Sequence, residues 1–239
     1  MPEPITMDMN TMHPMREFLD RVDKYLAAET ITGTMMCKVL ALDPGETTGW
    51  SLFTCDPVTG AYWDHYHGQI DCGSRQGALD VGELETIDSG SMNSRGEALG
   101  VERILRLVDE NPTVAIVVED FIVDMRQITK SRSALSPVRI TARLQQGLWH
   151  RGMDIMLQER SNPKVTMNDD RLKEIGAYQR AGGLQHARDA DRHGIYFLRR
   201  CQNSAELRHK AWPWAFGPAP LKKTKRKKKP EGERIVFGD

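Results

Sequence analysis

The chain lacks any long apolar run, and this absence excludes one class of protein. No stretch approaches the roughly 18 consecutive apolar residues of a membrane-spanning helix, so we expect no integral membrane protein and no membrane partner. The segment Met1–Glu17 has no basic start followed by an apolar run, so a secretory signal is not expected. We therefore expect a cytoplasmic protein.

Cysteine is scarce, and its spacing is irregular. Cys37, Cys55, Cys72 and Cys201 form no Cys-x-x-Cys pair. Disulfide frameworks and structural zinc sites are recognised by closely and regularly spaced cysteines. We therefore expect reduced thiols, as is usual in the cytosol.

Net charge is also lacking, but the charges are unevenly distributed. The 239 residues carry 33 basic and 33 acidic side chains. Leu221–Asp239 has eight Lys or Arg against three Asp or Glu, so this tail carries +5 and residues 1–220 carry −5. Such a block repels itself, which predicts a disordered tail that either aids solubility or binds nucleic acid. Its candidate DNA-binding cations are Lys222, Lys223, Lys225, Arg226, Lys227, Lys228 and Lys229.

Apolar patterning predicts alternating strands and helices along the chain. The strand patterns fall at residues 38–42, 49–54, 61–70, 114–118 and 154–158. The helix patterns fall at about 14–33, 98–111, 136–150 and 184–203, and a long loop is expected at 73–93. This order predicts a mixed α/β sheet with helices on its faces. The expected divisions are an N-terminal extension with an amphipathic helix (1–36), a main domain (37–212) and a linker with the basic tail (213–239).

The aromatic and histidine side chains give little information about function. Trp50, Trp63 and Trp149 are expected in the core. His65 and His67 share one face of the third strand, and we expect no metal role for them.

The first segment with chemical content is Leu40–Trp50. An apolar strand ends on Asp43, and Pro44 and Gly45 force an immediate turn. The carboxylate therefore lies at the edge of the sheet, where a ligand can reach it. An ordinary hairpin whose Asp caps the turn has the same pattern.

The second segment, Ala115–Phe121, repeats this arrangement. Its apolar run ends on Glu119 and Asp120, which point to opposite faces because side chains alternate along a strand. Only one of them can join Asp43, and we select Glu119, the first acid after the apolar run.

The third segment lies at the start of the last predicted helix. His186 and Asp189 are three residues apart and share one flank of its buried face. His193 continues this flank one turn later, whereas Asp191 falls on the other flank. Taken alone, the pattern is typical of a solvated helix edge.

Together the three segments predict a site for a hard cation. Carboxylates brought close together repel one another unless a divalent ion compensates them. Oxygen ligands with one imidazole favour Mg²⁺ or Mn²⁺ over zinc. Two such ions can activate water and stabilise the leaving oxygen in phosphodiester cleavage.

These motifs resemble those of RuvC-like Holliday junction resolvases of the RNase H-like (retroviral integrase) superfamily, particularly the phage-encoded branch. The resemblance spans about 38–202 and rests on the order and separation of the three segments. It implies a five-stranded mixed sheet, with three antiparallel strands followed by two parallel ones and flanking helices. It also implies a homodimer acting on branched DNA without a nucleotide cofactor, in the host cytoplasm if phage-encoded. The catalytic and metal-binding residues that it implies are Asp43, Glu119, His186 and Asp189, holding two Mg²⁺ or Mn²⁺ ions.

Basic side chains beside these segments are candidates for phosphate contacts. They follow the second acid or lie on the next helix, where arginines are more often simply solvated. The set is Arg126, Lys130, Arg132, Arg139 and Arg143.

Two other functions remain open. A nucleotide-binding ATPase of the actin and sugar-kinase type also has an Asp-x-Gly-x-Thr turn after its first strand, as in Asp43–Thr47. Such proteins need a second lobe and a second Asp-Gly phosphate loop, which this sequence does not show. A catalytically inactive DNA-binding module is the other alternative, although it would have no need for the acids.

Overall fold

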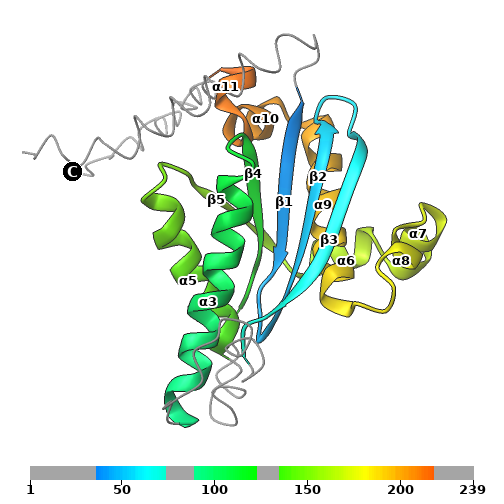
Figure 1. Cartoon of the computed structure of the whole chain (residues 1–239). Helices are drawn as coiled ribbons and strands as arrows, with labels where there is room; N and C mark the ends of the chain where they lie inside the picture. Colours follow the sequence, from blue (N-terminus) through cyan, green and yellow to red (C-terminus); the bar gives the residue numbers. More distant parts are fainter. Residues whose placement is uncertain (1–35, 74–88, 123–134, 218–239) are drawn as a thin grey trace, which may run out of the picture.

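A five-stranded sheet with helices on both faces forms the described part of the protein, residues 36–73, 89–122 and 135–217 of a computed structural model (Figure 1). The strands are β1 (Cys37–Asp43), β2 (Thr47–Asp56), β3 (Ala61–Asp71), β4 (Val114–Asp120) and β5 (Ile155–Glu159). Their order is β3-β2-β1-β4-β5. The first three strands are antiparallel, whereas β4 and β5 run parallel to β1. The predicted fold is confirmed.

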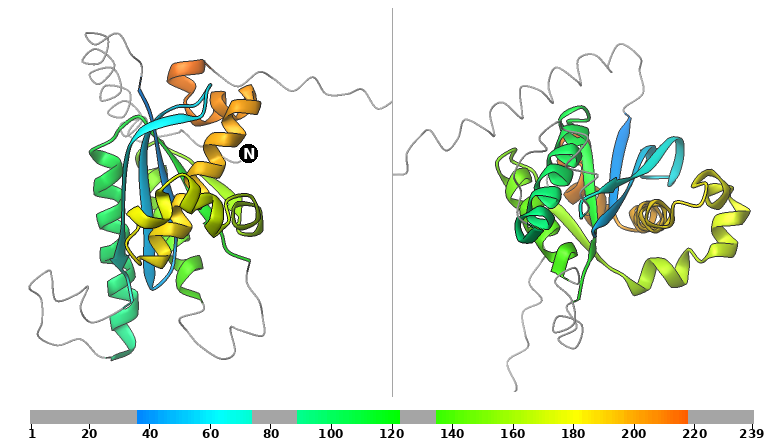
Figure 2. Two further views of the ribbon diagram at one scale, coloured as in Figure 1. Left: turned by 90° about the vertical axis from the view of Figure 1, so that its right-hand side faces the viewer. Right: turned by 60° about the horizontal axis from the view of Figure 1, so that its bottom comes forward.

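Helices cover the sheet unequally. α3 (Ser89–Asp109) and α5 (Ser136–Trp149) lie on one face, and α9 (Gln185–Asn203) lies on the other (Figure 2). Within the described residues, no helix combines the length and apolar character needed to cross a bilayer. The short helices are α6 (Ser161–Thr166), α7 (Asp169–Glu174), α8 (Ala177–Arg180), α10 (Ala205–Ala211) and α11 (Pro213–Phe216).

Alternation along the central strands produces two separate cores. Leu40 and Leu42 of β1 pack with the aliphatic side chains of α3 and α5. Val39, on the other face, packs with Phe53 of β2 and Phe197 of α9. Because odd-numbered residues of β1 and β4 face α9, any acid at an odd position there points under this helix.

Several expectations about elements were wrong. Residues 89–93 are helical where a loop was predicted, because the start of α3 has no apolar stripe to reveal it. The short helices α6, α7, α8 and α10 were not predicted, since each is too short for a periodic pattern. α11 follows in a segment where the sequence indicated a linker.

The tryptophans also differ from expectation. The exposed fraction is 49% for Trp63 and 71% for Trp149, so neither belongs to the core. Trp50 is half-buried against the α3–α5 core, and Trp212 is fully buried. The predicted helix 14–33, most of the loop 73–93 and the basic tail lie outside the described residues.

Candidate metal centre

Strand register places the first two acids side by side. Leu42 of β1 pairs with Val118 of β4 in parallel register, so the next residues, Asp43 and Glu119, are neighbours at the ends of their strands. Both carboxylates are buried on the face that α9 covers, with exposed fractions of 8% and 4%. Asp120 points to the opposite face, as alternation requires.

The turn after β1 is held by a threonine. The Thr48 hydroxyl accepts a hydrogen bond from the Gly45 amide at 3.2 Å and lies 2.9 Å from the Gly45 carbonyl, to which it donates. Thr48 is fully buried, so this short loop is fixed from inside. The Asp-Pro-Gly turn therefore gives Asp43 a defined position at the end of the sheet.

A glycine allows the start of α9 to reach this turn. A Cβ atom on Gly49 would lie 1.9 Å from the carbonyl oxygen of His186, which is closer than any real contact. The His186 amide also donates to the Gln69 side-chain oxygen at 3.0 Å, which satisfies one of the free amides in the first turn of the helix. These contacts hold the first turn of α9 against β2 and β3, beside Asp43.

His186 and Asp43 then meet directly. Nδ1 of His186 lies 2.9 Å from Oδ2 of Asp43, and the His186 side chain is 43% exposed. This hydrogen bond and the Asp43 charge raise the pKa of His186 above its usual 6.5, against the opposing effect of partial burial. Burial raises the pKa of Asp43, and the charges of Glu119 and Asp189 raise it further, whereas the bond to His186 lowers it.

Glu119 is oriented from α9 by a neutral histidine. His193 Nε2 lies 2.9 Å from the Glu119 carboxylate. The Gln158 amide nitrogen lies 2.9 Å from His193 Nδ1 and 3.2 Å from the His193 carbonyl. The carbonyl can only accept, so it fixes the amide nitrogen of Gln158 at this position. His193 Nδ1 then accepts, and its Nε2–H donates to Glu119.

Cationic side chains surround the remaining carboxylate. Asp189, 7% exposed, forms ion pairs with Arg192 and with Lys164, whose Nζ lies 3.3 Å away. Arg192 also pairs with Asp169.

A cationic side chain also lies beside the second acid: Nε of Arg160 is 3.3 Å from Glu119. Lys164 is 34% exposed and Arg160 is 61% exposed, so both can also meet an external anion.

The structure brings the four site residues to one end of the sheet. The electrostatic influence of Glu119, Asp189 and His186 on Asp43 reflects their proximity. Asp191 does not join them and turns instead toward β3. Sequence reasoning missed Gln158 and Arg160, whose partners lie far away in the chain. It also missed Arg192, although its partner Asp189 is three residues away on the same helix.

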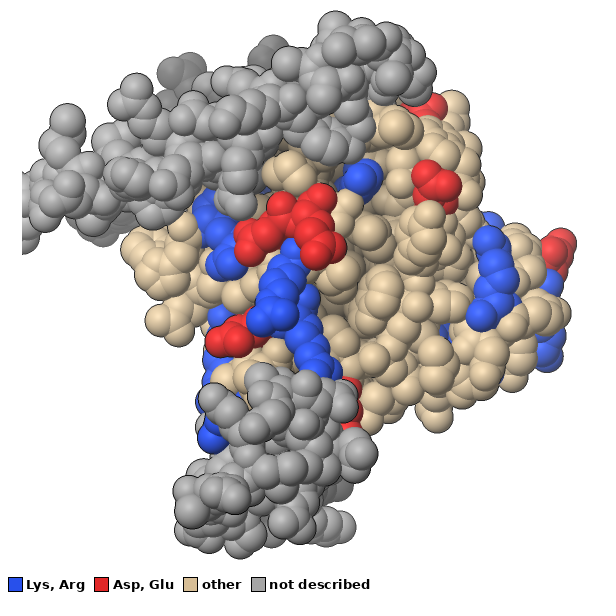
Figure 3. All heavy atoms as spheres, viewed as in Figure 1, with Lys and Arg blue, Asp and Glu red and all other residues tan. Residues whose placement is uncertain are grey.

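The predicted DNA-binding cations are placed only in part. Arg139 on α5 is bonded through two nitrogens to Glu97, a fully buried acid of α3. The bond to Glu97 raises the pKa of Arg139, and Glu46 in the turn after β1 contributes. Arg143 is half-buried one turn later. Acidic and basic side chains are interleaved over the α3–α5 layer (Figure 3). The other candidates, Arg126, Lys130, Arg132 and the tail, lie outside the described residues.

Comparison with known proteins supports the fold alone. No family model and no curated protein matches the sequence. Thermus thermophilus RuvC in complex with a Holliday junction substrate aligns with a TM-score of 0.53 at 12% identity, covering 71% of this chain and 96% of that one. A second Thermus thermophilus RuvC structure aligns with a TM-score of 0.45 at 14% identity, covering 68% of this chain and 96% of that one. The chain thus shares the RuvC fold, a form of the RNase H-like architecture.

Proposed function

We propose that this chain is a divalent-metal-dependent endonuclease that hydrolyses phosphodiester bonds in branched DNA, of which the Holliday junction is the type. The convergence of Asp43, Glu119, His186 and Asp189 at one end of the sheet carries this proposal. The shared fold adds support, because the aligned RuvC structure contains a Holliday junction substrate.

The donor set fits magnesium or manganese. Three carboxylates and one imidazole supply mainly oxygen ligands, which these ions prefer. Burial raises the pKa of Asp43, and the charges of Glu119 and Asp189 raise it further, so a dication would relieve an existing repulsion. Asp43, Glu119, Asp189 and His186 would hold two such ions. When bound, they lower the pKa of water and stabilise charge on the phosphate.

The protein's own side chains orient this donor set. His186 holds the Asp43 carboxylate, and the neutral His193 holds Glu119 without cancelling its charge. Lys164 and Arg160 lie beside the acids and remain partly exposed, so they can bind the phosphates that flank the cleaved bond. The arrangement therefore binds, aligns and neutralises a phosphodiester backbone.

The alternatives explain less of the geometry. A nucleotide-binding ATPase would account for the turn after Asp43, but not for the buried contacts of Glu119 and Asp189 under α9. An inactive DNA-binding module would gain nothing from burying three acids, because each lowers stability unless it is compensated. Both alternatives predict outcomes that a cleavage assay distinguishes.

The decisive experiment is cleavage of a labelled four-way junction with Mg²⁺. We expect wild-type cleavage, and for Asp43→Asn a loss greater than the roughly 100-fold that removal of an outer-sphere partner causes. Asp120→Asn is the matched control, because it neutralises a strand-end acid on the opposite face and should retain activity. Absence of wild-type cleavage, or full activity of Asp43→Asn, contradicts the proposal. Hydrolysis of ATP without DNA supports the ATPase.

The proposal includes symmetric cleavage by a homodimer and electrostatic binding of DNA by the tail. Sedimentation of the protein with its junction tests the dimer. Deleting Leu221–Asp239 should weaken junction binding and flatten its salt dependence while leaving the cleavage step intact. An unchanged salt slope would assign the tail another purpose.

A further inference from the structure

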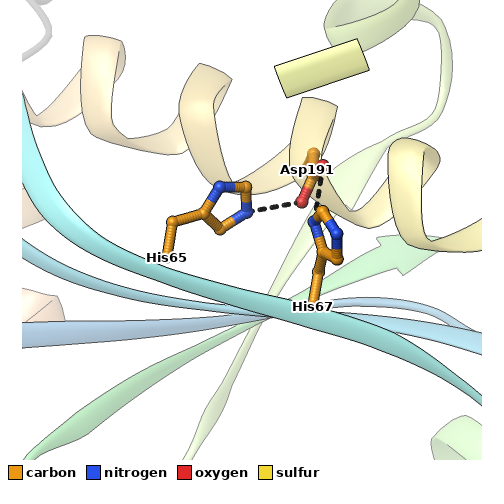
Figure 4. A group of neighbouring side chains, drawn as sticks. All are labelled: His65, His67 and Asp191. Carbon is orange, nitrogen blue, oxygen red and sulfur yellow. Dashed lines mark hydrogen bonds and ion pairs between the residues drawn. The ribbon is translucent and has the colours of Figure 1, made fainter. Parts of the chain in front are cut away.

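A second group of ligating side chains lies away from the candidate metal centre, between β3 and α9. His65 and His67 project from the same face of β3, and Asp191 projects toward them from α9 (Figure 4). One ligand atom from each residue lies within 4.8 Å of the other two. Nε2 of His65 is 2.7 Å from one carboxylate oxygen, and Nδ1 of His67 is 3.2 Å from the other.

The group is buried and held in place before any ligand binds. The exposed fractions of the side chains are 0% for Asp191, 1% for His65 and 14% for His67. The His65 ring stacks on Phe53, with centroids 4.4 Å apart and an angle of 9° between the planes. The Ser51 hydroxyl donates to Asp191 at 2.7 Å. Of these three side chains, His67 is the most exposed to solvent.

The bonding of His67 requires a proton or a metal ion between its ring and Asp191. Nε2 of His67 lies 3.1 Å from the carbonyl oxygen of Arg180, which can only accept, so this nitrogen carries a hydrogen. In a neutral ring, Nδ1 would then turn a lone pair toward a carboxylate oxygen. Either a proton or a metal ion must therefore lie between them. A backbone carbonyl on the non-ligating N–H is the usual environment of a metal-binding histidine.

We propose that His65, His67 and Asp191 form a binding site for a zinc-class dication, separate from the magnesium centre. Two imidazoles and one carboxylate suit zinc, whereas magnesium prefers oxygen ligands. Ligand atoms about 2.0–2.1 Å from a tetrahedral zinc lie about 3.3 Å apart. The 3.2 Å between His67 and Asp191 matches this spacing, whereas the 2.7 Å between His65 and Asp191 would lengthen on binding. The fourth ligand would be water or the Ser51 hydroxyl. The ion would join β3 to α9, the helix that carries His186 and Asp189.

Titration of the chelator-treated full chain with ZnCl₂ alone tests this site. We expect zinc binding by calorimetry. At zinc about a hundredfold above Kd, we expect the unfolding temperature to rise by about 5 °C or more. The double variant Asp43→Asn, Asp189→Asn should keep both responses, because it removes carboxylates of the magnesium centre only.

His67→Gln should lose the zinc response, whereas His150→Gln, at an exposed position after α5, should retain it. A tetrahedral Co²⁺ absorption spectrum of the wild type provides a readout that does not depend on the folding of any variant. In the Asp43→Asn, Asp189→Asn background, zinc binding that survives His67→Gln overturns the proposal, and so does a wild type that zinc neither binds nor stabilises. The second result would leave a proton between His67 and Asp191.

Discussion

The two faces of the sheet differ in what they bury. The face toward α3 and α5 is packed mainly with aliphatic side chains. Burying charge lowers stability unless each charge is paired and hydrogen-bonded. Both faces carry an apolar core, but the α9 face also gives up stability to bury a group of acids. The acids buried under α9 are Asp43, Glu119, Asp189 and Asp191.

Opposite effects of two substitutions would establish this difference between the faces. Leu144, 1% exposed, packs in the α3–α5 core, and Leu144→Ala should lower the free energy of unfolding by about 2–5 kcal/mol. Asp43→Asn should leave that free energy unchanged or raise it in the metal-free protein, because it removes a buried charge that is unfavourable there. Urea unfolding measures both.

Cleavage per folded molecule completes this test. Leu144→Ala should retain it and Asp43→Asn should lose it. A conservative control, Leu144→Met, should lower the free energy of unfolding by less than about 1.5 kcal/mol because it keeps the side-chain volume. If Asp43→Asn destabilised the protein as much as Leu144→Ala, the proposed contrast between the faces would be wrong.

His193 tests whether the buried polar contacts of the α9 face orient the acids. His193→Gln breaks the link from Gln158 to Glu119, and should lower the affinity for Mg²⁺ by about 10–100-fold. Raising the Mg²⁺ concentration should recover part of the cleavage. Loss of activity that no Mg²⁺ concentration reverses, with unchanged affinity, would contradict a positioning role. Exposed His150 after α5 provides a surface control in His150→Gln.

The ion pair of Arg139 with Glu97 is the exception on the α3–α5 face. Glu97 is fully buried, so Arg139→Ala leaves a carboxylate without its bidentate partner and should cost about 1–3 kcal/mol of stability. The double variant Arg139→Ala, Glu97→Gln should recover part of this loss. Weaker DNA binding without loss of stability would instead assign Arg139 to phosphate contact, as the sequence suggested.

The sequence was sufficient for the sheet and for the long helices because local apolar periodicity encodes them. It also separated Glu119 from Asp120, since alternation along a strand is a local rule. It did not reveal the partners of His193 or Arg139, which lie on other elements 74 and 42 residues away. It also placed Trp149 in the core, although this residue is 71% exposed. Packing between elements decides such contacts, and no local sequence pattern predicts that packing.

The smallest expected effect is on the pH dependence of the stability of the metal-free protein. The hydrogen bond to Asp43 raises the pKa of His186, so the folded state holds this proton more tightly than the unfolded state. This contribution to stability is complete below the ordinary pKa of 6.5 and is lost as pH rises through the folded value. The raised pKa of Asp43 acts in the same direction at lower pH.

With chelator present, the unfolding temperature of the wild type should therefore fall more steeply between about pH 6 and pH 8 than that of His186→Gln. The partial exposure of His186 keeps the difference small. His150→Gln should follow the wild-type slope, since that ring is remote from the acids. Equal slopes for wild type and His186→Gln would mean that Asp43 does not retain the His186 proton. In that case, protons and Mg²⁺ would not compete at this imidazole, and low pH would weaken cleavage only through the carboxylates.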